Sequence, residues 1–116
     1  MKVSRHHLDT IDFEELEIRD YTADLDLSSS VAEVIVPPGA VHRRAYSRRS
    51  DKYYIVIRGA LDFILDGEPI ELGVGDLCVV PQGTRFSYRN STDEPAVTAL
   101  IHTPSFDLNQ EVFEEL

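Results

Sequence analysis

The chain has 116 residues and a mass of 13.1 kDa, with 42% hydrophobic and 28% charged residues. That is the size and apolar content of one small globular domain, and two domains would not fit. Its single cysteine, Cys78, cannot form an internal disulfide. The net charge of −10 repels phosphate backbones and anionic lipids, which argues against binding to nucleic acids or membranes. The N-terminal sequence lacks an apolar signal-peptide segment, so we expect a cytoplasmic protein.

The basic residues are unevenly distributed along the chain. Five of the eleven lie close together, and these are Arg43, Arg44, Arg48, Arg49 and Lys52. The segments near the two ends are acidic. A local positive patch on an acidic protein predicts attraction of a small anionic or carbonyl-rich ligand, and it is equally typical of a solvated loop.

The first thirty residues have no regular pattern. Asp9 or Thr10 is suited to cap a one- or two-turn helix in the sequence IDFEELE, and a terminal strand fits this segment equally well. The acidic tail from Asp107 onward fits either a helical turn or a strand. We expect neither end to form a separate domain.

From Val31 onward, turn residues recur about every eight to twelve residues, and the segments between them are rich in β-branched and aromatic residues. Strands are therefore predicted at residues 31–36, 41–47, 52–59, 60–67, 69–73, 76–81, 85–90 and 96–103. Asp66-Gly67 predicts a hairpin, because both central positions of a type I′ turn need positive φ. The pattern indicates an all-β sandwich or barrel in a single domain, 1–116, with short irregular or helical ends.

Two motifs within this strand series resemble those of the cupin family. The first motif consists of Gly, five residues, His-x-His, three or four residues, Glu, six residues and Gly. The second motif consists of Gly, five residues, Pro-x-Gly, two residues, His, three residues and Asn. The frame positions present in this chain are Gly39, Gly59, Gly75, Asp76, Pro81, Gly83 and Asn90. The resemblance covers about residues 31–104 and implies a jelly-roll β-barrel, which agrees with the strand pattern.

The metal-binding positions of these motifs are altered. In metal-binding cupins the two histidines and the glutamate of the first motif and the histidine of the second hold the ion. Here the four positions hold Ala45, Ser47, Lys52 and Phe86. Alanine and phenylalanine have no donor atom, serine is a weak ligand and a lysine ammonium repels a cation. We therefore expect no metal at these positions and no cofactor.

Alternate residues of a cupin strand face the barrel interior, so the phase of these four positions predicts which side chains line a cavity. The predicted lining residues are Arg43, Ser47, Lys52, Tyr54, Val56, Phe86 and Tyr88. A barrel with only a structural role would be filled by Val, Ile and Leu, because unpaired buried polar groups cost free energy. The polar lining therefore predicts a ligand.

Histidine is the usual general acid or base near neutral pH, and a tyrosine beside cations can assist it if its phenolate is stabilised. His42 with Tyr54 is the predicted pair, although strict alternation turns His42 away from the cavity unless a bulge follows the sequence PPGA. His102, at the end of the last strand, is the alternative base. Lys52 would polarise a carbonyl or hold an enolate. The adjacent His6 and His7 are interpreted as surface residues.

These groups fit proton abstraction next to a carbonyl, followed by β-elimination of water or by epimerisation. The segments SDKYYIVIRG, VVPQGTRFSY and TPSFD also resemble small metal-independent cupin dehydratases of the pacidamycin type, which act on a uridine aldehyde. That resemblance implies proton transfer by His42 and Tyr54. Together these arguments predict catalytic roles for His42, Tyr54 and Lys52 and substrate binding by Arg43, Ser47, Phe86, Tyr88 and His102.

Two other functions remain open at this stage, a non-catalytic cupin that binds or senses a small molecule and an interaction module whose barrel is packed solid. The expected ligand is a small polar or anionic molecule that contains a carbonyl group. The sequence does not decide between a monomer and a homodimer.

Overall fold

The computed structural model describes residues 1–114, which form eleven strands and two short 3-10 helices. In chain order these are η1 (Arg5–His7), β1 (Ile11–Phe13), β2 (Leu16–Asp20), β3 (Ser30–Val36), β4 (Val41–Ser47), β5 (Asp51–Arg58), β6 (Leu61–Leu65), β7 (Glu68–Leu72), β8 (Leu77–Val80), β9 (Phe86–Arg89), β10 (Ala96–Thr103), η2 (Leu108–Gln110) and β11 (Glu111–Phe113). Within this part of the chain, no helix is both long enough and apolar enough to cross a membrane.

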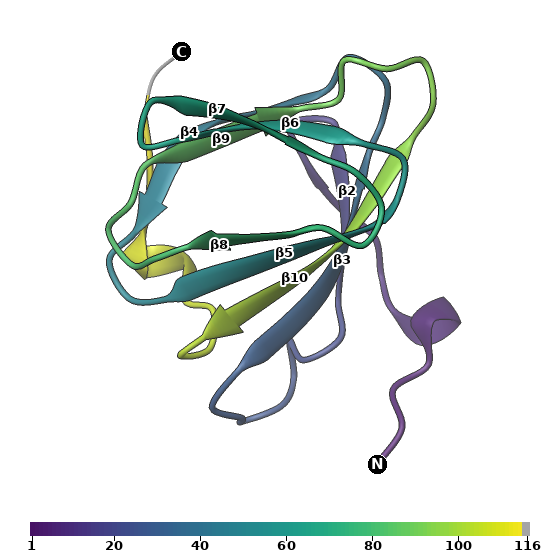
Figure 1. The fold of residues 1–116 in the computed structure, drawn as a ribbon. Coiled ribbons are helices and arrows are strands. Elements are labelled where there is room, and N and C mark those ends of the chain that lie inside the picture. The colour runs from purple at the N-terminus through teal and green to yellow at the C-terminus, as the bar shows by residue number, and fades with distance from the viewer. Residues whose placement is uncertain (115–116) are drawn as a thin grey trace.

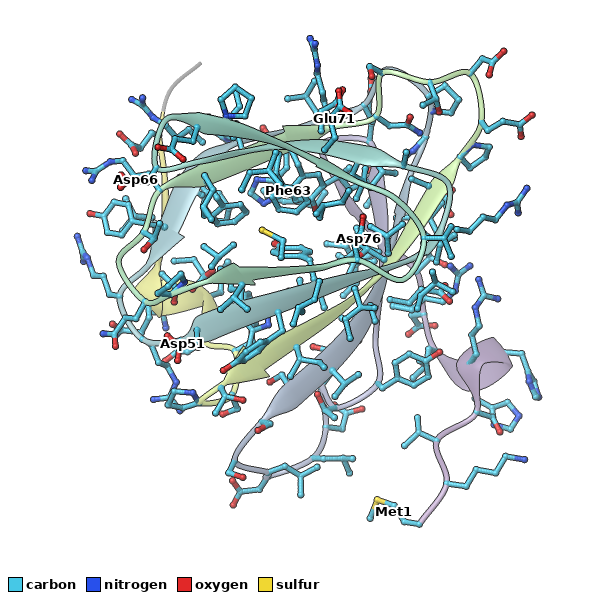
Figure 2. All side chains as sticks on the ribbon, in the orientation of Figure 1. Met1, Asp51, Phe63, Asp66, Glu71 and Asp76 are labelled. Atoms are coloured by element: carbon cyan, nitrogen blue, oxygen red, sulfur yellow. The ribbon has the colours of Figure 1, made fainter. Side chains whose placement is uncertain are left out.

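The strands form two antiparallel sheets that face each other (Figure 1). One has six strands in the order β1-β2-β3-β10-β5-β8, and the other has five in the order β11-β4-β9-β6-β7. Alternation along the strands turns one row of side chains toward the opposite sheet. Figure 2 shows side chains, Phe63 among them, that point into the space between the sheets. The predicted all-β jelly-roll architecture is confirmed.

All eight strands predicted from residue 31 onward are present, with ends that differ from the expected ones by no more than a few residues. Asp66 and Gly67 have φ values of 49° and 82° and join β6 to β7, as the hairpin signal predicted. At a corner of the barrel, the buried Asn90 donates from Nδ2 to the backbone oxygens of Val36 and Glu94. The local turn chemistry therefore fixes the frame of the barrel.

The N-terminal segment forms a hairpin of β1 and β2, so the helix alternative for IDFEELE is wrong and the strand alternative is correct. Glu14 and Glu15 turn the chain with φ values of 50° and 79°. Pairing of β2 with β3 brings Leu16 into the core, where it is fully buried. The tail contains both elements considered for it, a 3-10 turn and a short strand that pairs with β4.

Strand β4 contains a bulge next to the predicted general base. His42 lies opposite Tyr88 on β9, and Ala45 lies opposite Phe86, so three steps along β4 match two along β9. The extra residue reverses the alternation locally. His42 and Ala45 are therefore both buried on the inner face. The bulge that the sequence required for an inward-facing His42 is present.

Candidate active site

A cavity of about 280 Å³ lies between the two sheets. The N-terminal hairpin and the C-terminal segment around β11 complete its wall. The polar residues that line it are Asp20, Ser30, His42, Lys52, Tyr54, Tyr88, His102 and Glu111. The remaining lining residues are aliphatic or aromatic, including Phe13, Phe86, Phe106 and Phe113. An apolar cavity with a few converging polar groups is the usual form of a small-molecule site.

Six of the eight predicted site residues line this cavity, and they are His42, Lys52, Tyr54, Phe86, Tyr88 and His102. Arg43 and Ser47 do not. The bulge turns Arg43 outward, where it forms an ion pair with Glu14 at 3.0 Å. The expectation that Arg43 faces the cavity is therefore wrong, because strict alternation was assumed across the bulge.

Ser47 is buried but serves the turn between β4 and β5. Its Oγ accepts hydrogen bonds from the backbone N–H groups of Arg49 and Ser50, at 3.2 and 2.9 Å. Ser47 faces inward, as the alternation predicted, but it lies at the end of the strand, beyond the cavity wall. Val56 is likewise buried in the core and does not line the cavity.

The rest of the arginine-rich patch also lies away from the cavity. Arg44 pairs with Glu114 at 3.3 Å, and Arg49 donates from Nε to the backbone oxygen of Ser105 at 2.8 Å. Arg48 is exposed on the turn that follows β4. The patch therefore ties the C-terminal segment to the barrel, and the positive charge expected at the cavity comes from Lys52 alone.

His42 is held in one tautomer. Its Nδ1 donates a hydrogen bond to the backbone oxygen of Arg43 at 2.6 Å, because a carbonyl oxygen can only accept. The proton therefore sits on Nδ1, and Nε2 keeps its lone pair. The ring lies 5.0 Å from both Phe86 and Tyr88, measured between ring centroids. Burial among these rings lowers the pKa of His42 from 6.5 to about 4. His42 is therefore a neutral base.

The two phenols of the site keep their protons. Complete burial raises the pKa of Tyr54 well above its usual value of 10, and the pKa of Tyr88 is raised by the same desolvation. The ring of Tyr88 lies between those of His42 and Tyr54, with centroid distances of 5.0 and 5.4 Å. A protonated phenol can donate a hydrogen bond, and burial does not favour the phenolate considered in the sequence analysis.

Lys52 lies between two partners at the wall of the cavity. Its Nζ donates to Glu111 Oε1 in a buried ion pair, and it donates to His102 Nε2 at 3.0 Å. His102 is directly opposite Lys52 in the pairing of β10 with β5. Burial lowers the pKa of Lys52, while the Glu111 carboxylate acts in the opposite direction and favours the ammonium form.

His102 is thereby occupied as a hydrogen-bond acceptor. Burial, together with the charge of Lys52, lowers the pKa of His102 from 6.5 to about 3, so its ring stays neutral. Its Nε2 lone pair faces the lysine ammonium. Between the two histidines of the cavity, His42 is the one whose free lone pair can accept a proton from a ligand.

Sequence reasoning missed Glu111, whose side chain is 3% exposed and lines the cavity. It also missed Phe13 and Phe113, whose rings lie 5.2 Å apart. No motif includes these residues, and the acidic tail gave no sign of facing inward. The only available signal was the alternation of Glu111, Val112 and Phe113 within a short potential strand.

The residues present do not fit the metal site of metal-binding cupins. Ala45 and Phe86 offer no donor atom, and the ammonium of Lys52 occupies the position of the glutamate ligand. Within residues 1–114, no group of three or more His, Cys, Asp or Glu side chains is arranged to hold an ion.

Residues 32–102 match the family model described as the cupin domain, so the chain belongs to the cupin family. Among curated proteins, it is 35% identical over 71 residues to an uncharacterized protein of Aquifex aeolicus, covering 61% of this chain and 58% of that one. It is also 35% identical over 63 residues to endoribonuclease YbeY of Myxococcus xanthus, covering 54% of this chain and 21% of that one. In both cases the match spans less than two thirds of the relative.

The fold is shared with several solved structures. Pac13, described as a unique nucleoside dehydratase, has a TM-score of 0.87 and 24% identity, covering 100% of this chain and 92% of that chain. A histidine-to-glutamine variant of the Streptomyces protein, solved with uridine, has a TM-score of 0.86 and 24% identity over 99% and 91% of the two chains. KdgF from Halomonas sp. has a TM-score of 0.80 and 23% identity over 90% and 94%. At these identities the likeness establishes the fold.

Proposed function

We propose that this protein is a cupin enzyme that uses acid and base side chains in place of a metal at the usual cupin positions. It would act as a lyase or an isomerase on a sugar- or nucleoside-like carbonyl substrate. The observation that carries the proposal is the neutral His42, whose free Nε2 lies in a cavity that also contains hydrogen-bond donors. A base and an anion-stabilising donor together are sufficient for proton abstraction next to a carbonyl.

In the first step, His42 Nε2 takes the proton from the carbon next to the carbonyl group, and the bonding electrons move to the carbonyl oxygen. A lysine ammonium has three N–H groups, and two of those of Lys52 are used by Glu111 and His102. The third is free to donate to the enolate oxygen. The protonated phenol of Tyr54 or Tyr88 would supply a second donor.

The enolate can then follow either of two routes. In elimination, the carbonyl reforms, a carbon–carbon double bond appears, and the β-hydroxyl group leaves with a proton as water. In epimerisation, the proton returns to the opposite face of the same carbon. Elimination is the favoured route, since Pac13 is described as a nucleoside dehydratase and its uridine-bound structures include histidine and tyrosine variants. In this chain, the proposed base is likewise a histidine, His42, and the proposed phenol donors are the tyrosines Tyr54 and Tyr88.

The test measures solvent deuterium uptake and water loss by mass spectrometry on a panel of nucleoside aldehydes, keto-sugar nucleotides and small keto acids. The wild type is compared with His42→Gln, and His7→Gln serves as the control because His7 is exposed near the N-terminus. We expect deuterium uptake or water loss with the wild type and His7→Gln and none with His42→Gln. Melting temperatures establish that all three proteins are folded.

Two results would contradict the proposal. Full activity of His42→Gln would remove the assigned base. Binding of a panel member with neither exchange nor water loss would favour the alternative function, a non-catalytic cupin that binds or senses a small molecule.

A further inference from the structure

One carboxylate oxygen at the cavity has no partner. Glu111 extends from β11 to the cavity wall, and its Oε1 accepts a hydrogen bond from Lys52. Its Oε2 is buried, and no donor among residues 1–114 reaches it. An ionised carboxylate oxygen is a strong acceptor, and leaving it buried without a donor costs free energy. A small shift of the Glu111 side chain would bring this oxygen to the cavity, where a ligand that donates a hydrogen bond would remove that cost.

The charges that line the cavity disfavour a ligand that already carries a negative charge when it binds. Asp20 and Glu111 are carboxylates, Lys52 is the one cation among the lining residues, and its charge is balanced by Glu111. The arginines of the patch face outward, as described above. A phosphate group would therefore meet a carboxylate and no unpaired cation, in surroundings where burial strengthens repulsion.

The opening of the cavity is apolar. Ile11, Phe106 and Leu108 line the cavity and are also 50%, 39% and 62% exposed, which places them at its opening. A rim of apolar side chains suits an uncharged ring, and the side chains of these three residues give a phosphate group no hydrogen-bond donor. The opening and the interior of the cavity therefore both favour an uncharged ligand.

We propose that the cavity selects an uncharged nucleoside-like ligand over its phosphate esters, and that Glu111 is the selecting residue because its Oε2 accepts a hydrogen bond from the ligand. The ligand class rests on the proposed function. The role of Glu111 rests on the unpartnered oxygen, the charges of the lining and the apolar rim. Glu111 thereby acts in substrate specificity, in addition to holding Lys52 in place.

Equilibrium binding by calorimetry tests this proposal with two probes, uridine and uridine 5′-monophosphate. We expect the wild type to bind uridine at least about ten times more tightly than the monophosphate, because only the monophosphate brings charge to the carboxylate. In Glu111→Gln, the amide oxygen accepts from Lys52 and the NH₂ group replaces Oε2, so it faces the donor of the ligand. Uridine affinity should fall by about tenfold or more, while that of the monophosphate should not fall.

Glu114→Gln is the matched control, since Glu114 lies in the same tail and pairs with Arg44 and Arg85 outside the cavity. It should leave the ratio of the two affinities unchanged. If Glu111→Gln does not fold, as judged by circular dichroism, Glu111→Asp replaces it. That variant keeps the charge, shortens the side chain by one methylene, and should weaken uridine binding.

Equal or tighter binding of the monophosphate by the wild type would overturn the proposal. So would an unchanged affinity ratio in Glu111→Gln, unchanged uridine binding in Glu111→Asp, or the absence of uridine binding at millimolar concentration. Because binding is measured without turnover, these failures are distinct from a failure of proton exchange. A protein that exchanges protons on a phosphorylated substrate would retain the proposed function and lose this inference.

Discussion

His42 Nδ1 donates to the backbone oxygen of Arg43, the next residue in the chain, across a distance of 2.6 Å. The bulge in β4 makes this contact possible, because it turns the Arg43 side chain outward while His42 stays inside. A single irregularity therefore places the imidazole in the cavity and fixes its tautomer. The free Nε2 is the group on which the proposed chemistry depends.

The first prediction concerns the pH dependence of proton exchange. Burial lowers the pKa of His42 to about 4, so the neutral base persists throughout the range from neutral pH down to about pH 5. We expect the exchange rate to be nearly constant across this range and to fall as the pH approaches 4. The rate is followed by NMR at pH values where circular dichroism shows folded protein. An inflection near the ordinary histidine value of 6.5 would contradict the assignment.

The second prediction concerns acid stability. The pKa values of His42 and His102 are lowered from 6.5 to about 4 and about 3, so the unfolded chain binds more protons than the folded chain below pH 6.5. The free energy of unfolding should therefore decrease as the pH falls through this window, by roughly 2 kcal/mol per histidine between pH 7 and 5.

Urea unfolding at several pH values measures this effect, and His102→Gln provides the comparison. The free energy of unfolding of the variant should depend less steeply on pH. The difference in slope should correspond to at most one bound proton. An equal slope in both proteins would show that His102 is not buried in its neutral form.

The third prediction concerns the buried ion pair of Lys52 and Glu111. Lys52→Met leaves a carboxylate buried without its cation, which should lower the free energy of unfolding by about 3 to 5 kcal/mol. Addition of Glu111→Gln removes that charge and should restore part of the loss. The two changes should therefore not be additive, with a coupling of about 1 kcal/mol or more in urea unfolding. Additive losses would show that the two side chains do not interact.

The fourth prediction compares two glycines that both have positive φ. A Cβ at Gly59 would lie 2.8 Å from the backbone oxygen of Pro95, whereas a Cβ at Gly75 would meet nothing within 4 Å. Both alanine variants carry the cost of the left-handed conformation, and only Gly59→Ala adds a clash with backbone. We expect Gly59→Ala to melt at least about 4 °C below Gly75→Ala in a thermal scan. Equal melting temperatures would indicate that the β10 end of the barrel can move to accommodate the new side chain.

The barrel could be predicted from sequence because its signals are local. Turn residues mark each strand end, and the spacing of Gly39, Gly59, Gly75 and Asn90 matches two motifs. The N-terminal segment was ambiguous because its apolar residues suit either a helix or a hairpin. Pairing of β2 with β3, a contact between separate segments, determines the outcome.

The site could be predicted only where alternation holds. Lys52, Tyr54 and Tyr88 lie in regular strands, and their phase placed them correctly. Arg43 was misplaced because the position of a bulge is not visible in a single sequence. Glu111 was missed because its partner, Lys52, lies 59 positions earlier in the chain. Contacts over such distances follow from the fold as a whole.

The contact between Phe13 and Phe113 joins segments that lie on the order of a hundred positions apart, and both rings belong to the cavity wall. In chain order, β11 follows all the other strands, so it is the last strand to leave the ribosome during synthesis. Until β11 emerges and docks, Lys52 lacks the carboxylate of Glu111, and the cavity lacks one wall. The cavity is therefore complete only after β11 has paired with β4.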